Sequence, residues 1–394
     1  MGASNQQHPD ITANWGFPTT VRVGPGRVAE LPDLCTELGF ARPLVVTDRG
    51  IRGLAMFDSA LAALEAAGIA AGVFADIDGE PTGTTVDAAV EALRAGGHDS
   101  VIAFGGGSAL DAAKGAALMC GQQRPIWEFE DIGDNWKRAD AGAIVPCIAV
   151  PTTAGTGSEV GRAAVITNEA NHRKMIIFHP RMLPQAVILD PETNAGMPPW
   201  LTAGTGMDAF SHCFEAWCAP GFHPMADGIA LEGLRLTGEA LPRAYADGGD
   251  LEARTHMLAA ASMGGTAFQK GLGAIHAVSH PVGALFHTHH GLTNAVVLPY
   301  VMQFNRDAIA GRMAPVAHAL GLAEASYDAV LDWVLRFRER LGVPATLAEL
   351  GADETAAEEV GRLGEVDPPA ASNPVPVAAA DLAGIYRNAV AGRL

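Results

Sequence analysis

The amino-acid sequence predicts an α/β protein in which a doubly wound parallel sheet precedes an all-helical region. In the first half of the chain, short β-rich runs alternate with helical stretches, a rhythm typical of parallel sheets covered by helices. After Asp190-Pro191 the pattern changes to long Ala-, Leu- and Met-rich stretches with helical spacing, separated by Gly and Pro breaks. We therefore predict an α/β domain over residues 1–190 and a helical domain over residues 191–394.

Each element of the first half follows from its local pattern. Helices are predicted where the pattern is helical, at 54–67, 85–95 and 109–119. Strands are predicted where short apolar runs occur, at 44–47, 101–104, 144–150, 163–167, 174–177 and 186–189, with another beginning at 73–74. Residues 364–377 are rich in Pro, Ala and Val, which predicts a loop between helices.

Composition and charge exclude several classes of function. The 394 residues are 48% hydrophobic and 18% charged, as in a soluble globular protein, and the formal net charge is −18. So acidic a chain, without a local Lys/Arg cluster, is not expected to bind nucleic acid or an anionic membrane. Residues 1–10 show no secretory signal, and no apolar run could span a bilayer.

The cysteines indicate the compartment. They are five in number, scattered, and form no CxxC pair. We therefore expect reduced thiols in a cytoplasmic protein. The five are Cys35, Cys120, Cys147, Cys213 and Cys218.

A glycine-rich turn follows the predicted strand at 101–104. Gly105, Gly106, Gly107 and Ser108 lead into a helix that carries Asp111 and Lys114. Residues without side chains let the backbone approach an anion, and a helix N-terminus offers unpaired N–H groups, so a pyrophosphate fits there. A tight turn with no ligand is the alternative.

A second polar loop, residues 151–159, follows the next strong strand. It contains Thr152 and Thr153 and lacks the Gly-Lys-Ser/Thr ending of a P-loop, which argues against an NTPase. Two such loops after successive parallel strands favour a dinucleotide site. Asp48, at the end of an earlier strand, is a candidate for the ribose hydroxyls; a carboxylate that only caps the next turn is the alternative.

Histidines concentrate in the second half, where eight of the thirteen lie between His212 and His290. Asp208 and His212 are spaced i, i+4 on one predicted helix, and His276 and His280 repeat this spacing on another. An Asp oxygen and several imidazoles that converge from different helices would suit Fe(II), Zn(II), Mn(II) or Co(II). Ordinary surface pairs at helical spacing are the alternative.

These motifs, in this order from about Leu44 to Pro299, resemble those of the iron-containing (group III) alcohol dehydrogenases. The resemblance implies a Rossmann-like N-terminal domain, a helical C-terminal domain as in the dehydroquinate synthase-like fold, and an active site in the cleft between them. It also implies NAD and Fe(II) as cofactors, with Zn(II) or another divalent metal as the alternative. A homo-oligomer, a dimer or larger, is expected.

The resemblance also implies a role for individual residues. His280 matches the histidine proposed to relay protons, and Asp48 matches the residue associated with preference for NAD over NADP. The metal ligands would be Asp208, His212, His276 and His290. The cofactor would be bordered by Gly105, Gly106, Gly107, Ser108, Asp111, Thr152, Thr153 and Lys174.

Some residues near the expected substrate pocket depart from the family pattern. Phe268 is shifted by one position, Lys270 follows it, and His287 and His289 precede the last ligand histidine. These features resemble the branch that contains 4-hydroxybutyrate dehydrogenases. Phe268, Lys270 and His287 are therefore candidate substrate residues, and Lys270 is a candidate partner for a substrate carboxylate. A solvated lysine at a helix end is the alternative.

The predicted reaction is hydride transfer between a small primary alcohol, such as a hydroxy acid of the 4-hydroxybutyrate type, and the nicotinamide. Two related chemistries stay open. A metal-free reductase similar to maleylacetate reductases would ignore chelators. A lyase similar to dehydroquinate synthase would use NAD without net production of NADH.

Overall fold

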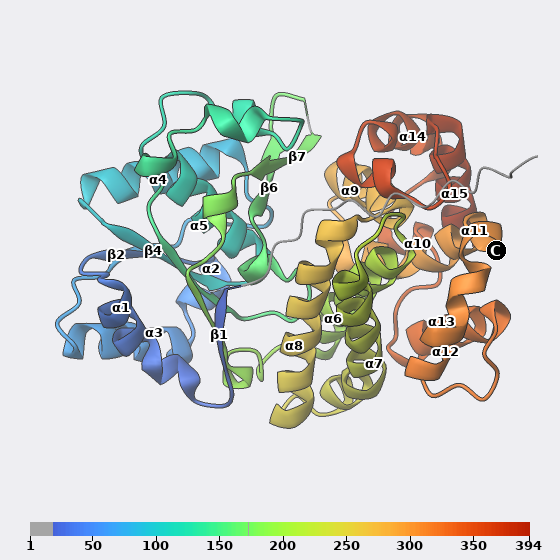
Figure 1. Ribbon diagram of the computed structural model, residues 1–394, viewed down its shortest axis with the longest axis horizontal. Helices are drawn as coiled ribbons and strands as arrows, with labels where there is room; N and C mark the ends of the chain where they lie inside the picture. Colours follow the sequence, from blue (N-terminus) through green and yellow to red (C-terminus); the bar gives the residue numbers. More distant parts are fainter. Residues whose placement is uncertain (1–18, 172) are drawn as a thin grey trace, which may run out of the picture.

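A computed structural model describes residues 19–171 and 173–394, so the segment 1–10, for which no secretory signal is expected, lies outside the described residues. Figure 1 shows an α/β part, drawn in blue and green, beside a helical part drawn in yellow-green to red. In the described chain, no helix is both long and apolar enough to cross a membrane.

The α/β part is built on a six-stranded parallel sheet with the strand order β1-β8-β5-β4-β2-β3. The prediction of a parallel sheet is therefore confirmed. Its strands are β1 (Thr20–Val23), β2 (Pro43–Val46), β3 (Gly72–Phe74), β4 (Ser100–Gly105), β5 (Cys147–Pro151) and β8 (Ala186–Leu189). Its helices are α1 (Leu31–Leu38), α2 (Arg49–Arg52), α3 (Ala55–Ala66), α4 (Gly83–Ala95) and α5 (Gly107–Met119).

The two faces of this sheet bury different side chains, because successive residues of a strand point to opposite sides. Leu44 and Val101 belong to the core cluster that also includes the apolar residues of α4 and α5. Their chain neighbours Val45 and Ile102 belong to a separate cluster with those of α1 and α3. Burial on both faces explains why the central strands read as continuous apolar runs.

A two-stranded antiparallel sheet stands apart from the main sheet. It consists of β6 (Ala163–Asn168) and β7 (Arg173–Phe178), the two strand-like runs that precede β8 in the sequence. β6 packs against α5, and β7 packs against a helix of the second half, α9 (Ala274–Phe286). This small sheet therefore connects the two parts of the molecule, as its place between them in Figure 1 suggests.

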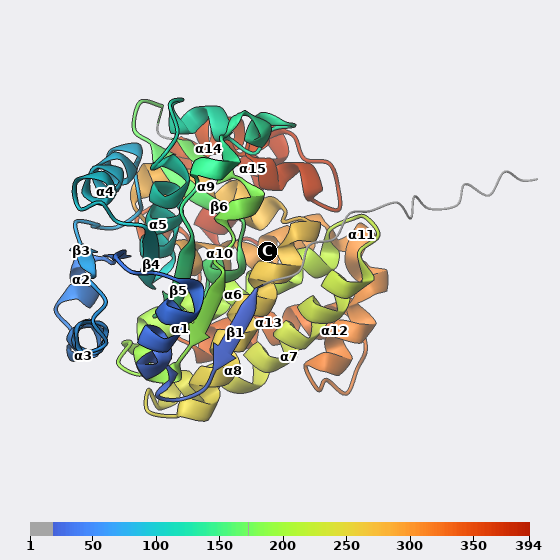
Figure 2. The same cartoon turned by 60° about the vertical axis from the view of Figure 1, so that its left-hand side comes forward.

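The helical part begins at Pro199, and the described chain has no strand after Leu189. The long antiparallel helices α6, α7 and α8 pack together and run side by side in Figures 1 and 2. The predicted loop at 364–377 contains one 3-10 turn, η12 (Pro368–Ser372). The other helices are α6 (Pro199–Cys218), α7 (Pro224–Ala246), α8 (Leu251–Ala267), α10 (His290–Phe304), α11 (Arg306–Ile309), α12 (Met313–Ala319), α13 (Tyr327–Arg340), α14 (Ala357–Glu365) and α15 (Ala379–Ala391).

The edge strand β1 and the helices α1 and α2 have no counterpart among the predicted elements. β1 is only four residues long and exposed, so its pattern contains no buried run. The predicted strand at 144–150 begins later, at Cys147, because the three residues between a 3-10 turn (Ala141–Ala143) and Cys147 are irregular. The other predicted strands and helices of the first half match observed elements within about three residues at each end.

Candidate active site

Four side chains predicted as metal ligands converge from three helices of the helical part. Asp208 and His212 come from successive turns of α6, His276 from α9, and His290 is the first residue of α10. One ligand atom from each of these residues lies within 4.8 Å of all the others. Asp208, His212 and His276 are buried and His290 is partly buried. We call this group the quartet.

A close approach of two helices brings Asp208 and His290 together. Gly291 of α10 lies against Gly204 of α6, so closely that a Cβ atom at Gly291 would be 2.1 Å from the Gly204 carbonyl oxygen. Any side chain at this position would push the helices apart. Glycine is therefore needed beside the ligand His290, for a reason of packing and not of backbone conformation.

The chemistry of the quartet fits a divalent metal ion. The Nε2 atoms of His212 and His276 face each other at 3.0 Å, and the Asp208 carboxylate lies 3.5 Å from His290 Nε2. Three imidazoles and one carboxylate in a buried setting suit a borderline divalent cation such as Fe(II) or Zn(II). We conclude that these residues could hold such an ion.

The surroundings of the quartet keep two of its histidines neutral, which is the form that binds a metal. Burial lowers the pKa of His212 and, together with the nearby Lys174 cation, holds the pKa of His290 well below its usual value. Burial also acts against the charged form of His276, but the carboxylates of Glu215 and Asp208 outweigh it and raise its pKa.

Two buried polar residues that the sequence did not single out support the quartet. Glu215, on α6, accepts hydrogen bonds from His276 Nδ1 at 2.5 Å and from the Ile275 amide at 2.8 Å. A carboxylate behind a ligand histidine orients the ring and raises its basicity. Asn294, on α10, donates to Asp208 Oδ1 at 2.8 Å. Helical spacing could have indicated both, since Glu215 lies three residues after one ligand and Asn294 four after another.

His280, the predicted proton relay, lies next to the quartet. Its ring is 5.4 Å from that of His290 and 5.6 Å from that of His276, measured between ring centres. Its Nδ1 atom lies 2.6 Å from the carboxylate of Asp367, a residue of the segment read as a loop. No signal in the sequence pointed to Asp367.

The predicted nucleotide loops meet at the carboxyl edge of the parallel sheet. Gly106 precedes α5, and no side chain caps the first amides of that helix. The second loop packs against it, so closely that a Cβ atom at Gly107 would lie 2.4 Å from the Thr156 hydroxyl oxygen. On either side, the buried hydroxyls of Thr47 and Thr152 have no hydrogen-bond partner in the described chain. Free amides, free hydroxyls and no side chains in the way fit a pyrophosphate.

Asp48 lies at the same edge of the sheet, with its carboxylate beside Gly105. It also caps α2, because its Oδ1 atom accepts a hydrogen bond from the Ile51 amide at 2.9 Å. The capping role that we considered as an alternative is therefore present. The cap uses only the Oδ1 atom. A role of Asp48 towards the ribose hydroxyls remains a prediction.

Asp111 does not have the surroundings expected of a cofactor residue. Its two carboxylate oxygens accept hydrogen bonds from the Ser158 hydroxyl at 2.6 Å and the Val165 amide at 3.0 Å, and the Lys114 ammonium lies 3.2 Å away. These bonds tie α5 to the segment after β5. We correct the prediction accordingly: Asp111 braces the helix, because protein donors already use both of its oxygens.

Lys174, predicted to border the cofactor, extends from β7 towards α9. Its ammonium pairs with Glu80 and lies beside Gly283. With His280 and Asp367 it lines a small pocket at the junction of the two parts. The prediction for Lys174 is therefore compatible with its position.

The three candidate substrate residues lie in different surroundings. The Phe268 ring packs 5.2 Å from the His212 ring, so it stays close to the quartet. Lys270 is buried and pairs with Asp227 at 2.5 Å, so its charge is already compensated and we no longer expect it to meet a substrate carboxylate. His287 is exposed and ends α9 in the left-handed conformation, which histidine adopts more readily than most residues.

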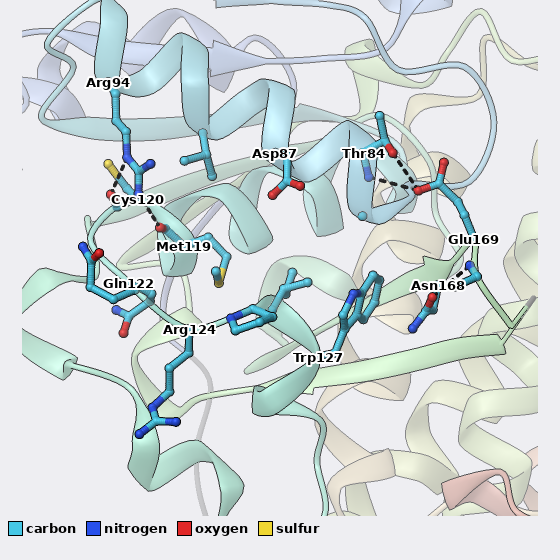
Figure 3. Close-up of a pocket in the computed structure, with 16 residues that line it drawn as sticks. Thr84, Asp87, Arg94, Met119, Cys120, Gln122, Arg124, Trp127, Asn168 and Glu169 are labelled. Atoms are coloured by element: carbon cyan, nitrogen blue, oxygen red, sulfur yellow. Dashed lines mark hydrogen bonds between the residues drawn. The ribbon is translucent and has the colours of Figure 1, made fainter.

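A hollow of about 700 Å³ lies away from all of these residues. Figure 3 shows it between α4, the end of α5 and the 3-10 turn η2 (Ile126–Phe129). Two of its polar side chains have partners: Arg94 donates to the Cys120 carbonyl, and Glu169 accepts from Thr84. None of its lining side chains is among the buried polar groups of the described chain that lack a partner. The hollow therefore offers no unpaired buried group for a ligand, and size alone does not locate the active site.

Comparison with known proteins gives an independent view of the chain. Residues 18–191 match the family model described as iron-containing alcohol dehydrogenase, and residues 202–390 match that of the Fe-containing alcohol dehydrogenase family, C-terminal. A 4-hydroxybutyrate dehydrogenase from Cupriavidus necator is 39% identical over 377 residues, which cover 93% of this chain and 96% of the relative.

Two further proteins are similar over almost their whole length. An NAD-dependent methanol dehydrogenase from Bacillus methanolicus is 33% identical, with 96% of this chain and 100% of the relative covered. The crystal structure of a 1,3-propanediol oxidoreductase superposes with a TM-score of 0.90 at 32% identity, covering 96% of this chain and 100% of the other. Both parts of the chain thus match one family, in agreement with the fold and with the quartet.

Proposed function

The chain belongs to the iron-containing alcohol dehydrogenase family and is an alcohol dehydrogenase, and from this premise we propose how it works and on what. It transfers hydride between a small primary alcohol and NAD(H), with Fe(II) held by the quartet and Zn(II) as the alternative ion. The observation that carries this proposal is the convergence of Asp208, His212, His276 and His290 within 4.8 Å.

The residues of this chain divide the work between the two parts. When bound, the ion supplies Lewis-acid chemistry that favours the alkoxide of the alcohol near neutral pH. The free amides at the start of α5 hold the pyrophosphate, and Thr152 and Thr153 border the cofactor. Glu215 orients His276. His280 accepts the alcohol proton and passes it to solvent.

The proposed substrate is a short alcohol, with hydroxy acids of the 4-hydroxybutyrate type as the first class to test. Support comes from the relative named 4-hydroxybutyrate dehydrogenase, at 39% identity. Because Lys270 is paired with Asp227, recognition of a carboxylate would need another cation. Phe268, beside His212, would form an apolar wall of the pocket.

The filled quartet argues against a metal-free reductase, which has no use for three buried ligands and a fourth that is partly buried. We further propose that the protein is a cytoplasmic homo-oligomer, at least a dimer. Its five cysteines are free thiols in the structure, which is compatible with a reducing compartment. Sedimentation analysis would test the oligomeric state.

The test is to strip the purified protein with a chelator and to follow NADH absorbance over short alcohols, diols, 4-hydroxybutyrate and the matching aldehydes. Fe(II) or Zn(II) is then restored under anaerobic conditions. We expect turnover only with metal. Turnover that persists without metal would favour a reductase of the maleylacetate type, and tight NAD binding without net NADH change would favour a lyase.

A further inference from the structure

A buried carboxylate from the last part of the chain reaches the candidate active site. Asp367 immediately precedes η12, and its side chain is 7% exposed. Its Oδ2 atom lies 2.6 Å from His280 Nδ1, whereas its buried Oδ1 atom has no hydrogen-bond partner in the described chain. The His280 ring is thus the one side chain that the carboxylate contacts by a hydrogen bond within the described residues.

Nearby cations do not compete for this carboxylate. Arg173 and Lys174 line the same small pocket, but each has another acidic partner. Arg173 lies 3.2 Å from Glu130, and Lys174 pairs with Glu80. Burying a carboxylate without a cation costs free energy, which hydrogen bonds offset only in part. For the Asp367 side chain, the bond to His280 is the one such bond within the described residues.

The position of Asp367 is fixed by further bonds between its segment and α9. The Ser372 hydroxyl accepts from the amide of Leu272, just before α9, at 3.1 Å, and the side-chain oxygen Oδ1 of Asn373 accepts from the Ala274 amide at 3.0 Å. α14, just before Asp367, packs against the same helix. We call residues 364–373 the C-terminal strap. It holds α9 at its start and at the turn of His280.

We propose that Asp367 is a positioning residue for proton transfer, acting through His280; this rests on the proposed dehydrogenase function. An ionised carboxylate only accepts hydrogen bonds, so the bond places the proton of the neutral ring on Nδ1 and leaves Nε2 as the basic nitrogen. In the oxidation, the C–H bond of the alcohol breaks and its hydride reduces NAD⁺. The O–H proton goes to Nε2 of His280, which later releases it to solvent, and the C–O bond becomes a carbonyl.

The first test compares Asp367→Asn with Glu365→Gln in the full-length, metal-loaded enzyme. The control makes the same chemical change two residues away, at an exposed side chain of the strap. Because an amide can donate to Nδ1 and stabilise the wrong tautomer, we expect kcat of Asp367→Asn to fall on the order of 10-fold to 100-fold. Its KM, metal content and melting temperature should match the control. An unchanged kcat, or loss of metal, would overturn the proposal.

A double-mutant cycle separates positioning from a general effect on structure. If Asp367 acts only through His280, then Asp367→Asn should have no further effect on kcat in a His280→Ala background. An equal loss in both backgrounds would mean that the carboxylate supports the fold and not the histidine.

A spectroscopic readout does not depend on turnover. With ¹⁵N-histidine in the zinc-loaded protein, His280 should be the Nδ1–H tautomer, and Asp367→Asn should shift it towards Nε2–H. The same tautomer in both proteins would refute the proposed role. If the wild-type protein oxidises no alcohol but Asp367→Asn still changes the tautomer of His280, the proposed function fails, while the role of Asp367 in setting the tautomer stands.

Discussion

The two halves of the candidate active site differ in the groups that they offer to a ligand. At the edge of the parallel sheet, the nucleotide loops offer backbone amides, Thr47 and Thr152 offer hydroxyls that have no partner among the described residues, and Gly107 leaves no room for a side chain. In the helical part, the quartet offers side-chain atoms, and partners such as Glu215 stand behind them. Cofactor binding at the sheet edge depends on the absence of side chains, whereas metal binding depends on the side chains of the quartet. Substitutions should therefore harm cofactor binding by adding atoms and metal binding by removing them.

Removal of a ligand should have the largest effect. In His276→Ala the metal loses one of four ligands, and the several kcal/mol that Lewis-acid catalysis contributes are lost, so turnover should fall by about three orders of magnitude or more. Metal content by mass spectrometry and NADH production are the measurements. His318→Ala, at an exposed histidine of the same part, is the control. Full activity without bound metal would show that the quartet is not the reaction centre.

Removal of charge behind a ligand should have the next largest effect. Glu215→Gln keeps the shape of the side chain but weakens the bond to His276 Nδ1. We expect metal affinity to fall about 10-fold to 100-fold, measured by competition with a chromogenic chelator. NAD binding should be unchanged. A fall in NAD affinity instead would show that metal binding and cofactor binding are coupled.

Addition of one methyl group tests the other half. In Gly107→Ala the new Cβ atom would meet the Thr156 hydroxyl at 2.4 Å, so one of the two loops must move. We expect the dissociation constant of NADH, followed by fluorescence, to rise about tenfold while metal content stays at the wild-type value. Gly53→Ala, where the added atom meets nothing within 4 Å, is the matched control. An unchanged dissociation constant would place the pyrophosphate elsewhere.

Alkylation of cysteine should have the smallest effect and leave both halves of the site intact. Burial raises the pKa of the Cys147 and Cys213 thiols to about 12, so at pH 8 they stay protonated and unreactive. Cys120 is only partly buried. Brief treatment with iodoacetamide should therefore label Cys120 first, as seen by peptide mass spectrometry, with turnover unchanged. Labelling of Cys213 in active protein would show that the region of His212 opens to solvent.

The sequence predicted those parts of the site that rest on local spacing. Asp208 and His212 share one helix, and the strand-loop-helix pattern located the glycine turn at Gly105, so both could be predicted without knowledge of the tertiary contacts. The same local reasoning assigned Asp111 to the cofactor. A carboxylate in the first turns of a helix after a glycine loop suits either role, and only the contacts with Ser158 and Val165 decide between them.

The remaining parts depend on contacts between distant segments. Asp367 is 87 residues from His280, and Asn373 is 99 residues from Ala274. No periodicity relates such positions, and the region around them reads as a loop. A contact between distant segments also explains why the prediction for Lys270 changed. Its partner Asp227 lies on another helix and compensates the charge that seemed available for a substrate.

The C-terminal strap has a consequence for how the protein is made. A ribosome synthesises His276 and His280 well before the residues that hold their helix, so a nascent chain that ends before Asp367 carries all four quartet ligands without the strap. We therefore expect the site to mature only after the C-terminal strap has left the ribosome. A product of premature termination would keep the metal-binding residues but lack the bonds that orient them, and the cell's proteases would meet it as an incompletely folded domain.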